Sequence, residues 1–257
     1  MPAGVIYPDW IGRSDILYVG DSESLGFFGD ELYRAISSTR DPVTSQNLTV
    51  GSIWICGSDA EDWTNGGVSS CGARACDSDK NCSRTDRHAS SKPVRYPGLR
   101  AYLEKVQPRI TLIALGANVL TRPLPDFSRF YPAYFKALSQ LLGEISRAGS
   151  LCIWIGPPQL SPLTKPLTTY AKFNRDLRIA VRHGNCLYID SNQLSDRSYI
   201  QPADKEGVHY QKEGELLWAR RTWPQLRPDL MELLYDSHAL ARYRNNRIPT
   251  QVLSRAH

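Results

Sequence analysis

A serine with catalytic potential directly follows an apolar run, in the sequence Gly20-Asp21-Ser22 after Ile16–Val19. A helical pattern, Ser24–Ser37, begins at once behind it. Ligands of parallel α/β sheets bind at the carboxyl ends of strands, and the free N–H groups of a helix start favour developing negative charge. Ser22 is therefore a candidate nucleophile. The alternative is a simple helix N-cap, for which Asp and Ser are both common.

An asparagine ends a second apolar segment, Leu112–Asn118, whose last three residues are Gly-Ala-Asn. A side-chain amide at the end of a strand can donate a hydrogen bond to an oxyanion. Asn118 is thus a candidate for stabilising a tetrahedral intermediate. The alternative is an Asx turn that caps the strand.

A histidine follows a glutamate by three residues in Glu206-Gly207-Val208-His209, just before a helical segment. A histidine that acts as a base through one ring nitrogen needs a carboxylate on the other. His209 is therefore a candidate general base, and the alternative is a solvated loop residue.

Together these segments resemble the SGNH/GDSL hydrolase superfamily. That family has short blocks in fixed order: Gly-Asp-Ser after the first strand, a glycine after the second, Gly-x-Asn after the third, and Asp-x-x-His near the C-terminus. Ser22 matches the nucleophile, Asn118 the oxyanion asparagine and His209 the base. Gly57, directly after the second apolar run, best matches the oxyanion glycine. The resemblance extends from residue 16 to about residue 214 and depends on about ten residues.

Two positions depart from the family pattern. Asn118 is followed by Val119 and not by Asp, which is tolerable because the amide carries the role. Glu206 stands where the family has Asp, and a glutamate can also accept the Nδ1–H bond of His209. We expect Glu206 to orient the imidazole, because Gly207 lets the backbone turn the carboxylate back onto the ring. Asp204 is the alternative.

The resemblance implies acyl transfer in two steps through an acyl-serine. His209 takes the proton as Ser22 attacks an ester carbonyl, and the oxyanion is held by the N–H groups of Ser22 and Gly57 and by the Asn118 amide. Neither a metal nor an organic cofactor is needed for this chemistry.

Five short apolar runs must position these residues, and each is followed by Gly or Asp, as in strands buried on both faces of a parallel sheet. They are Ile16–Val19, Ile53–Cys56, Ile110–Leu115, Leu151–Ile155 and Cys186–Ile189. Helical patterns alternate with them: Ser24–Ser37, Ala133–Ala148, Tyr170–Arg182 and a terminal helix, Glu213–Leu234, interrupted at Pro224 and Pro228. The alternation predicts a three-layer α/β/α sandwich with a five-stranded parallel sheet in flavodoxin-like order.

The segment Gly57–Pro97 breaks this alternation, since it is long, polar and rich in cysteine. We expect it to form a loop and one wall of the site. Its acids Asp59, Glu61 and Asp62 are interpreted as solvated loop residues and not as a metal site, because no histidine lies nearby in the sequence. One domain is expected over residues 1–238, followed by a basic, flexible tail over residues 239–257.

Four of the six cysteines surround this segment: Cys56, Cys71, Cys76 and Cys82. Their spacings fit neither zinc ribbons nor Cys-x-x-Cys redox sites, so we expect two disulfides among them, with the pairing open. Cys152 and Cys186 lie at the starts of two apolar runs, where they form either a third disulfide or two buried thiols.

Disulfides imply an oxidising compartment, so we expect a secreted or periplasmic protein whose signal peptide is absent from this sequence. The net charge of +5 is modest, and the sequence has no basic helix. Both observations argue against nucleic-acid binding. No apolar run is long enough to span a membrane. We expect a monomer.

The expected substrate is an O-acyl ester, such as an acetyl ester, on a carbohydrate or cell-wall glycan. The alternatives are an O-acyltransferase acting on the same acceptors, a lipid or thioester hydrolase, and a non-catalytic glycan-binding module. The presence of Ser22, Asn118 and His209 together argues against the last of these.

Overall fold

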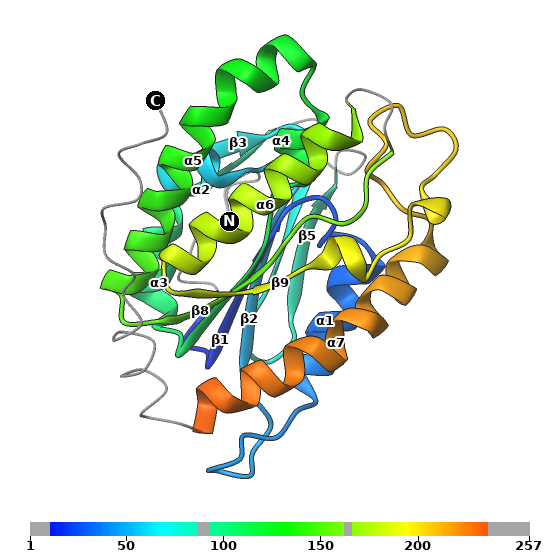
Figure 1. The fold of residues 1–257 in the computed structure, drawn as a ribbon. Coiled ribbons are helices and arrows are strands. Elements are labelled where there is room, and N and C mark those ends of the chain that lie inside the picture. The colour runs from blue at the N-terminus through cyan, green and yellow to red at the C-terminus, as the bar shows by residue number, and fades with distance from the viewer. Residues whose placement is uncertain (1–10, 87–92, 162–165, 236–257) are drawn as a thin grey trace.

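A seven-stranded mixed sheet forms the centre of the computed structural model, which describes residues 11–86, 93–161 and 166–235 (Figure 1). The strand order is β5-β4-β2-β1-β7-β8-β9. Its five parallel strands correspond to the five predicted runs: β1 (Ile16–Gly20), β2 (Val50–Ile55), β7 (Ile110–Ala114), β8 (Leu151–Ile155) and β9 (Cys186–Ile189). The prediction of a five-stranded, all-parallel sheet was wrong, because two antiparallel strands extend it. The expected tail, residues 239–257, lies outside the described residues.

The two additional strands, β4 (Gly72–Cys76) and β5 (Cys82–Asp86), come from the segment that was expected to be a loop. They form a hairpin that pairs antiparallel with β2. The rest of the segment folds into helix α2 (Ala60–Asn65) and a two-stranded sheet of β3 (Gly67–Ser69) and β6 (Val94–Tyr96). The small and polar residues of these strands give no hydrophobic alternation, and backbone pairing to β2 decides their conformation.

The parallel strands β1, β2 and β7 end level with one another. Gly20, at the end of β1, is in register with Trp54 on β2 and with Ala114 on β7. The turns after these strands therefore emerge at the same edge of the sheet, where ligands of open α/β sheets bind.

Helices cover both faces of the sheet (Figure 1). Leu17 and Val19 belong to the core that the sheet forms with α2, α3 (Leu99–Val106), α5 (Leu124–Arg147) and α6 (Leu167–His183). Ile16 and Tyr18 belong to the core formed with α1 (Phe27–Ser37) and α7 (Lys212–Tyr235). Because neighbouring residues of β1 face different cores, the strand is apolar along its whole length.

Helix α7 runs through the two prolines that were expected to interrupt it, Pro224 and Pro228. Each proline removes one backbone donor. Burial of Trp218, Leu226 and Leu230 against the sheet and α1 offsets this loss.

Three disulfides pair all six cysteines: Cys56–Cys71, Cys76–Cys82 and Cys152–Cys186. The prediction of two disulfides among the first four cysteines is confirmed. Cys152 and Cys186 are paired residues on the neighbouring strands β8 and β9, which brings their side chains together. No helix in the described ranges has the length and hydropathy needed to cross a membrane.

Candidate active site

Ser22 lies in a tight turn that leaves β1. The N–H of Ser24 donates to the carbonyl of Asp21 at 3.2 Å, and the N–H of Leu25 donates to the carbonyl of Ser22 at 3.2 Å. Ser22 is partly exposed, whereas Asp21 is buried. Within the described residues the Ser22 hydroxyl has no hydrogen-bond partner, so it is free to meet a ligand.

The helix behind this turn begins later than expected. Helix α1 starts at Phe27 and not directly after Ser22. Glu215 on α7 accepts hydrogen bonds from the backbone N–H groups of Phe27 and, at 3.2 Å, of Phe28. A carboxylate from a distant element thus supplies the cap that the local residues lack, and it fixes the helix start there.

Asn118 connects the turns after β1, β2 and β7. It is the second residue of the short helix α4 (Ala117–Thr121), which follows β7. Its Nδ2 donates to the carbonyl oxygen of Ser58 at 2.8 Å and lies 3.4 Å from a carboxylate oxygen of Asp21. The amide therefore lies between the other two strand ends.

Gly57, directly after β2, has a left-handed backbone with φ of +76°, which favours glycine at this position. In the described part of the chain, its N–H and that of Ser22 have no hydrogen-bond acceptor. Unpaired backbone donors beside a nucleophile are the usual components of an oxyanion hole.

The carboxylate at Nδ1 of His209 belongs to Asp204, at 3.2 Å. The same carboxylate accepts the backbone N–H groups of His209 and Val208, each at 2.7 Å, and that of Glu206 at 3.1 Å. Burial opposes ionisation of Asp204, but these hydrogen bonds outweigh it and hold its pKa below the usual value. A charged acceptor therefore fixes the ring orientation of His209.

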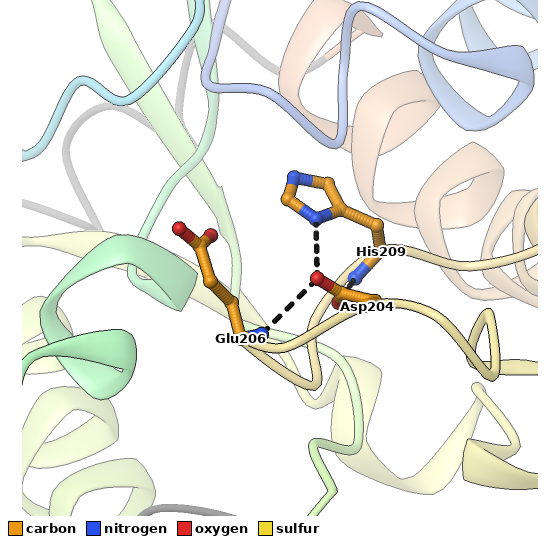
Figure 2. A group of neighbouring side chains, drawn as sticks. All are labelled: Asp204, Glu206 and His209. Atoms are coloured by element: carbon orange, nitrogen blue, oxygen red, sulfur yellow. Dashed lines mark hydrogen bonds and ion pairs between the residues drawn. The ribbon is translucent and has the colours of Figure 1, made fainter.

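Glu206, which the sequence favoured as the orienting residue, has an exposed side chain whose carboxylate lies within 4.8 Å of a ring nitrogen of His209 but forms no hydrogen bond to it, while the Asp204 carboxylate lies against Nδ1 (Figure 2). The reason is local: the loop turns so that its N–H groups surround Asp204, which leaves Glu206 at the rim. Within the described ranges, these two acids and His209 are the one group whose ligand atoms could together hold a cation. The Asp204 carboxylate already accepts four N–H groups there, so the group is better suited to orienting a base.

A second carboxyl group, which the sequence analysis missed, lies on the other side of the imidazole. Oε1 of Glu23 is 4.0 Å from Nε2 of His209, and the Glu23 side chain is only 3% exposed. Burial, together with the negative charge of Asp21, raises the pKa of Glu23 well above its usual value. Burial likewise raises the pKa of Asp21 to about 7. The one signal in the sequence was a charged residue between two serines, in the segment that directly follows the first apolar run.

Two of the three acids after Gly57, Asp59 and Asp62, have structural roles and are not solvated as expected, whereas Glu61 is exposed. Asp59 is the N-cap of α2, and its carboxylate accepts the N–H of Glu61 at 2.8 Å, while Asp62 bonds back to the Asp59 N–H at 3.0 Å. Asp59 is buried and pairs with Arg122 at 2.9 Å. A capping box and an ion pair therefore account for this acidic cluster.

A pocket of about 300 Å³ opens at the same edge of the sheet, beside the turns that follow β7 and β8. Its lining includes Leu120, close behind Asn118, and Pro158, which also borders a small cavity next to Glu23. Polar side chains of the pocket include those of Gln159 on the loop after β8 and Asn174 on α6. They also include Asn192 and Arg197, on the short 3₁₀ helices Ser191–Gln193 and Arg197–Tyr199. Nearby, the N–H of Ser161 donates to the carbonyl of Gly207 at 2.9 Å, which ties the pocket to the His209 loop.

Comparison with known proteins gives matches to solved structures alone. No family model matches the chain, and no curated protein matches its sequence. An acetylxylan esterase from Geobacillus stearothermophilus is similar to it with a TM-score of 0.51 and 15% identity, over 84% of this chain and 95% of that one. A protein assigned to the SGNH hydrolases from Slackia heliotrinireducens has a TM-score of 0.51 and 14% identity, over 84% and 100%. The esterase EstA from Pseudoalteromonas sp. has a TM-score of 0.50 and 16% identity, over 84% and 97%.

These structures are similar in fold over most of both chains, in agreement with the resemblance that the sequence blocks indicated. The chain therefore has the fold of the SGNH/GDSL hydrolases.

Proposed function

We propose that this chain is a serine carboxylic-ester hydrolase with Ser22 as nucleophile, His209 as general base and Asp204 as the carboxylate that orients the base. One observation carries the proposal: the His209 ring joins Asp204 to the Ser22 turn. Its Nδ1 lies 3.2 Å from Asp204, and its Nε2 lies 4.0 Å from Glu23, the residue next to Ser22. The order carboxylate, imidazole and hydroxyl-bearing turn is that of a serine hydrolase.

In the first step Ser22 Oγ attacks the ester carbonyl carbon while Nε2 of His209 accepts the hydroxyl proton. The carbonyl electron pair moves to its oxygen, and the backbone N–H groups of Ser22 and Gly57 and the Asn118 amide donate hydrogen bonds to the resulting anion. Ionised Asp204 stabilises the imidazolium. The intermediate collapses when the leaving alcohol takes the proton from Nε2, which leaves an acyl group on Ser22.

In the second step water replaces the alcohol. His209 accepts a proton from the water as its oxygen attacks the acyl carbon, and it then returns this proton to Ser22 Oγ as the acid leaves. One ester and one water are consumed, and one acid and one alcohol are formed. The residues at hand suffice for each proton transfer.

We infer that the ester is an O-acyl group, such as acetyl, on a carbohydrate or cell-wall glycan. The adjoining pocket supports this, because amide side chains of Gln159, Asn174 and Asn192 can bond to hydroxyl groups of a sugar. The acetylxylan esterase with the same fold acts on such an ester. A long acyl chain would instead call for a continuous apolar channel.

The three disulfides support action in an oxidising compartment. Cross-links of this kind persist in secreted and periplasmic proteins, whereas cytosolic thiols are kept reduced. We therefore propose that the protein works outside the cytosol.

A fluorophosphonate probe tests the nucleophile directly. Intact-mass and peptide analysis should find one covalent adduct on Ser22, and the Ser22→Ala variant should remain unlabelled. Ser24→Ala is the matched control, since Ser24 lies in the same turn but is fully buried and bonds Tyr18. Labelling elsewhere, or no labelling of the folded wild-type protein, would refute the proposal.

The substrate class is tested by comparing acetylated xylan and O-acetylated peptidoglycan with p-nitrophenyl esters of short and long acyl chains. We expect release of acetate from a glycan and a steep fall in kcat/KM from acetyl to palmitoyl esters. Faster cleavage of the palmitoyl ester would exclude the glycan esterase and would favour a lipase.

A further inference from the structure

Glu23 is a buried acid without a hydrogen-bond partner. Its side chain is 3% exposed, and both carboxyl oxygens lack a partner within the described residues. Burying a carboxyl group in this way is costly, and folded proteins rarely tolerate it without a reason. The residue is also unnecessary for the turn, whose hydrogen bonds use the backbone of Glu23 and not its carboxyl group.

The carboxyl group is close to the reacting nitrogen of the candidate base. Oε1 of Glu23 lies 4.0 Å from Nε2 of His209, the nitrogen that must receive the proton of Ser22. Asp204 occupies the opposite nitrogen at 3.2 Å. The imidazole of His209 therefore lies between two carboxyl groups, one at each nitrogen.

The groups around Glu23 are mostly acidic. Negative charges that raise the pKa of Glu23 belong to Asp21 in the same turn and to Glu215 on α7. Asp204 and Glu206, in the loop before α7, contribute in the same direction. In the described part of the chain, His209 is the one basic side chain within 4.0 Å of the Glu23 carboxyl group. These acidic neighbours disfavour a negative charge on Glu23 unless His209 carries a positive charge.

We propose that Glu23 is a positioning residue of the active site, a second acidic partner of His209 that shares one proton with Nε2 and sets the lower pH limit of activity. The inference rests on the proposed role of His209 as general base. While the pair holds its proton, Nε2 is engaged and cannot accept the proton of Ser22. Once the proton leaves, Nε2 is free, and the Glu23 carboxylate, like Asp204, stabilises the imidazolium that forms during attack.

The direction of the expected change follows from this arrangement. A carboxylate beside the imidazole stabilises the protonated ring, so the ring gives up its proton at a higher pH than it would alone. Glu23→Gln keeps the shape but removes the charge. The acidic limb of the kcat/KM profile should therefore move to lower pH by about one unit or more, and kcat on the alkaline plateau should fall.

The experiment measures kcat/KM for p-nitrophenyl acetate between pH 4 and 9 in the full chain. Wild type is compared with Glu23→Gln, with Glu23→Asp and with Glu206→Gln as matched control. Glu206→Gln removes the same charge near the same ring. Because Glu206 is exposed, solvent screens its charge, so the acidic limb of the kcat/KM profile should move far less in this variant. Glu23→Asp should restore part of the wild-type limb. An acidic limb in Glu23→Gln identical to wild type would overturn the proposal.

A second readout does not depend on turnover. The midpoint of the His209 imidazole titration, followed by NMR in the full chain, should move to lower pH in Glu23→Gln and far less in Glu206→Gln. If Glu23→Gln does not fold, Glu23→Leu, which suits a buried position, replaces it. An unchanged midpoint refutes the role of Glu23. Failure of wild type to react with a fluorophosphonate refutes the proposed function instead, while the titration still decides whether Glu23 and His209 share a proton.

Discussion

At the residue scale, orientation of His209 is the point on which structure and sequence spacing differ most. Asp204 is five residues before His209, and Glu206 only three, yet Asp204 contacts Nδ1. Three backbone N–H groups converge on its carboxylate and hold it ionised against the ring. Because the loop folds around Asp204, this acid contacts His209 although Glu206 is closer in the sequence.

The first prediction follows from this contact. Asp204→Asn should lower kcat by about 10²- to 10⁴-fold, because an amide can no longer stabilise the imidazolium and favours the wrong tautomer. Glu206→Gln should change kcat by less than about threefold, as expected for an exposed charge. Steady-state kinetics at pH 8 measure both. Equal losses in the two variants would contradict the assignment of Asp204.

The second prediction concerns Asn118, whose amide lies between the strand ends. Asn118→Ala should reduce kcat by about 10²- to 10³-fold with a smaller change in KM, since one oxyanion donor acts mainly in the transition state. The variant also loses the hydrogen bond to the Ser58 carbonyl, so its thermal unfolding must be recorded alongside. A loss confined to KM would show that Asn118 binds substrate and does not stabilise the oxyanion.

At the element scale, distant segments decide where local elements begin and how they are held. Glu215 of α7 supplies the N-terminal acceptor of α1, and β4 takes its extended form by pairing with β2. The disulfides add covalent links between such segments. The Cys56–Cys71 bond joins the residue before Gly57 to the start of the β4–β5 hairpin, so it holds in place the turn that carries Gly57, a proposed oxyanion donor.

The third prediction ranks the disulfides by the chain length they close. The separations are 34 residues for Cys152–Cys186, 15 for Cys56–Cys71 and 6 for Cys76–Cys82. Paired replacement by alanine should lower the free energy of unfolding by about 4, 3 and 2 kcal/mol respectively, through the entropy of the unfolded chain. Denaturant unfolding of the three double variants measures the order, and the reverse order would exclude this entropic origin.

At the scale of the whole molecule, charge and burial make stability depend on pH. Asp21 is fully buried, and burial raises its pKa to about 7, above the value of an unfolded aspartate. The folded state therefore binds a proton that the unfolded state releases between about pH 4 and pH 7. The contribution of Asp21 is present below the unfolded pKa and is lost as pH rises through 7. Asp204, whose pKa is lowered, changes stability only below this window.

The fourth prediction is that the free energy of unfolding decreases from pH 4.5 to pH 7.5, by up to about 1.4 kcal/mol per pH unit for this one group. Urea unfolding at four pH values measures the slope, and Asp21→Asn should reduce it, while Glu23, whose pKa is also raised, contributes the remainder. An increase in stability over the same range, or a slope as steep in Asp21→Asn as in wild type, would contradict the assignment to Asp21.

The sequence by itself determined the parts of this protein that depend on short-range pattern. Apolar runs buried on both faces predicted the five parallel strands. The positions of Ser22, Gly57 and Asn118, just after three of these runs, predicted that they lie near one another at one edge of the sheet. The sequence also indicated His209 as a candidate base and the first four cysteines as disulfide partners, while it left Cys152 and Cys186 open. These features could be predicted because strand periodicity and parallel topology constrain where consecutive strands end.

Only the tertiary structure decided the features that depend on long-range contact. It brought Asp204 rather than Glu206 to His209, added β4 and β5 to the sheet, and buried Glu23 beside Nε2. The pairing of the disulfides was decided in the same way. The local sequence around a carboxyl group or a cysteine does not indicate its partner, because the groups that bury it or bond to it come from distant segments of the chain. The partner is decided by the loop geometry that leaves the fewest buried polar groups without a hydrogen bond.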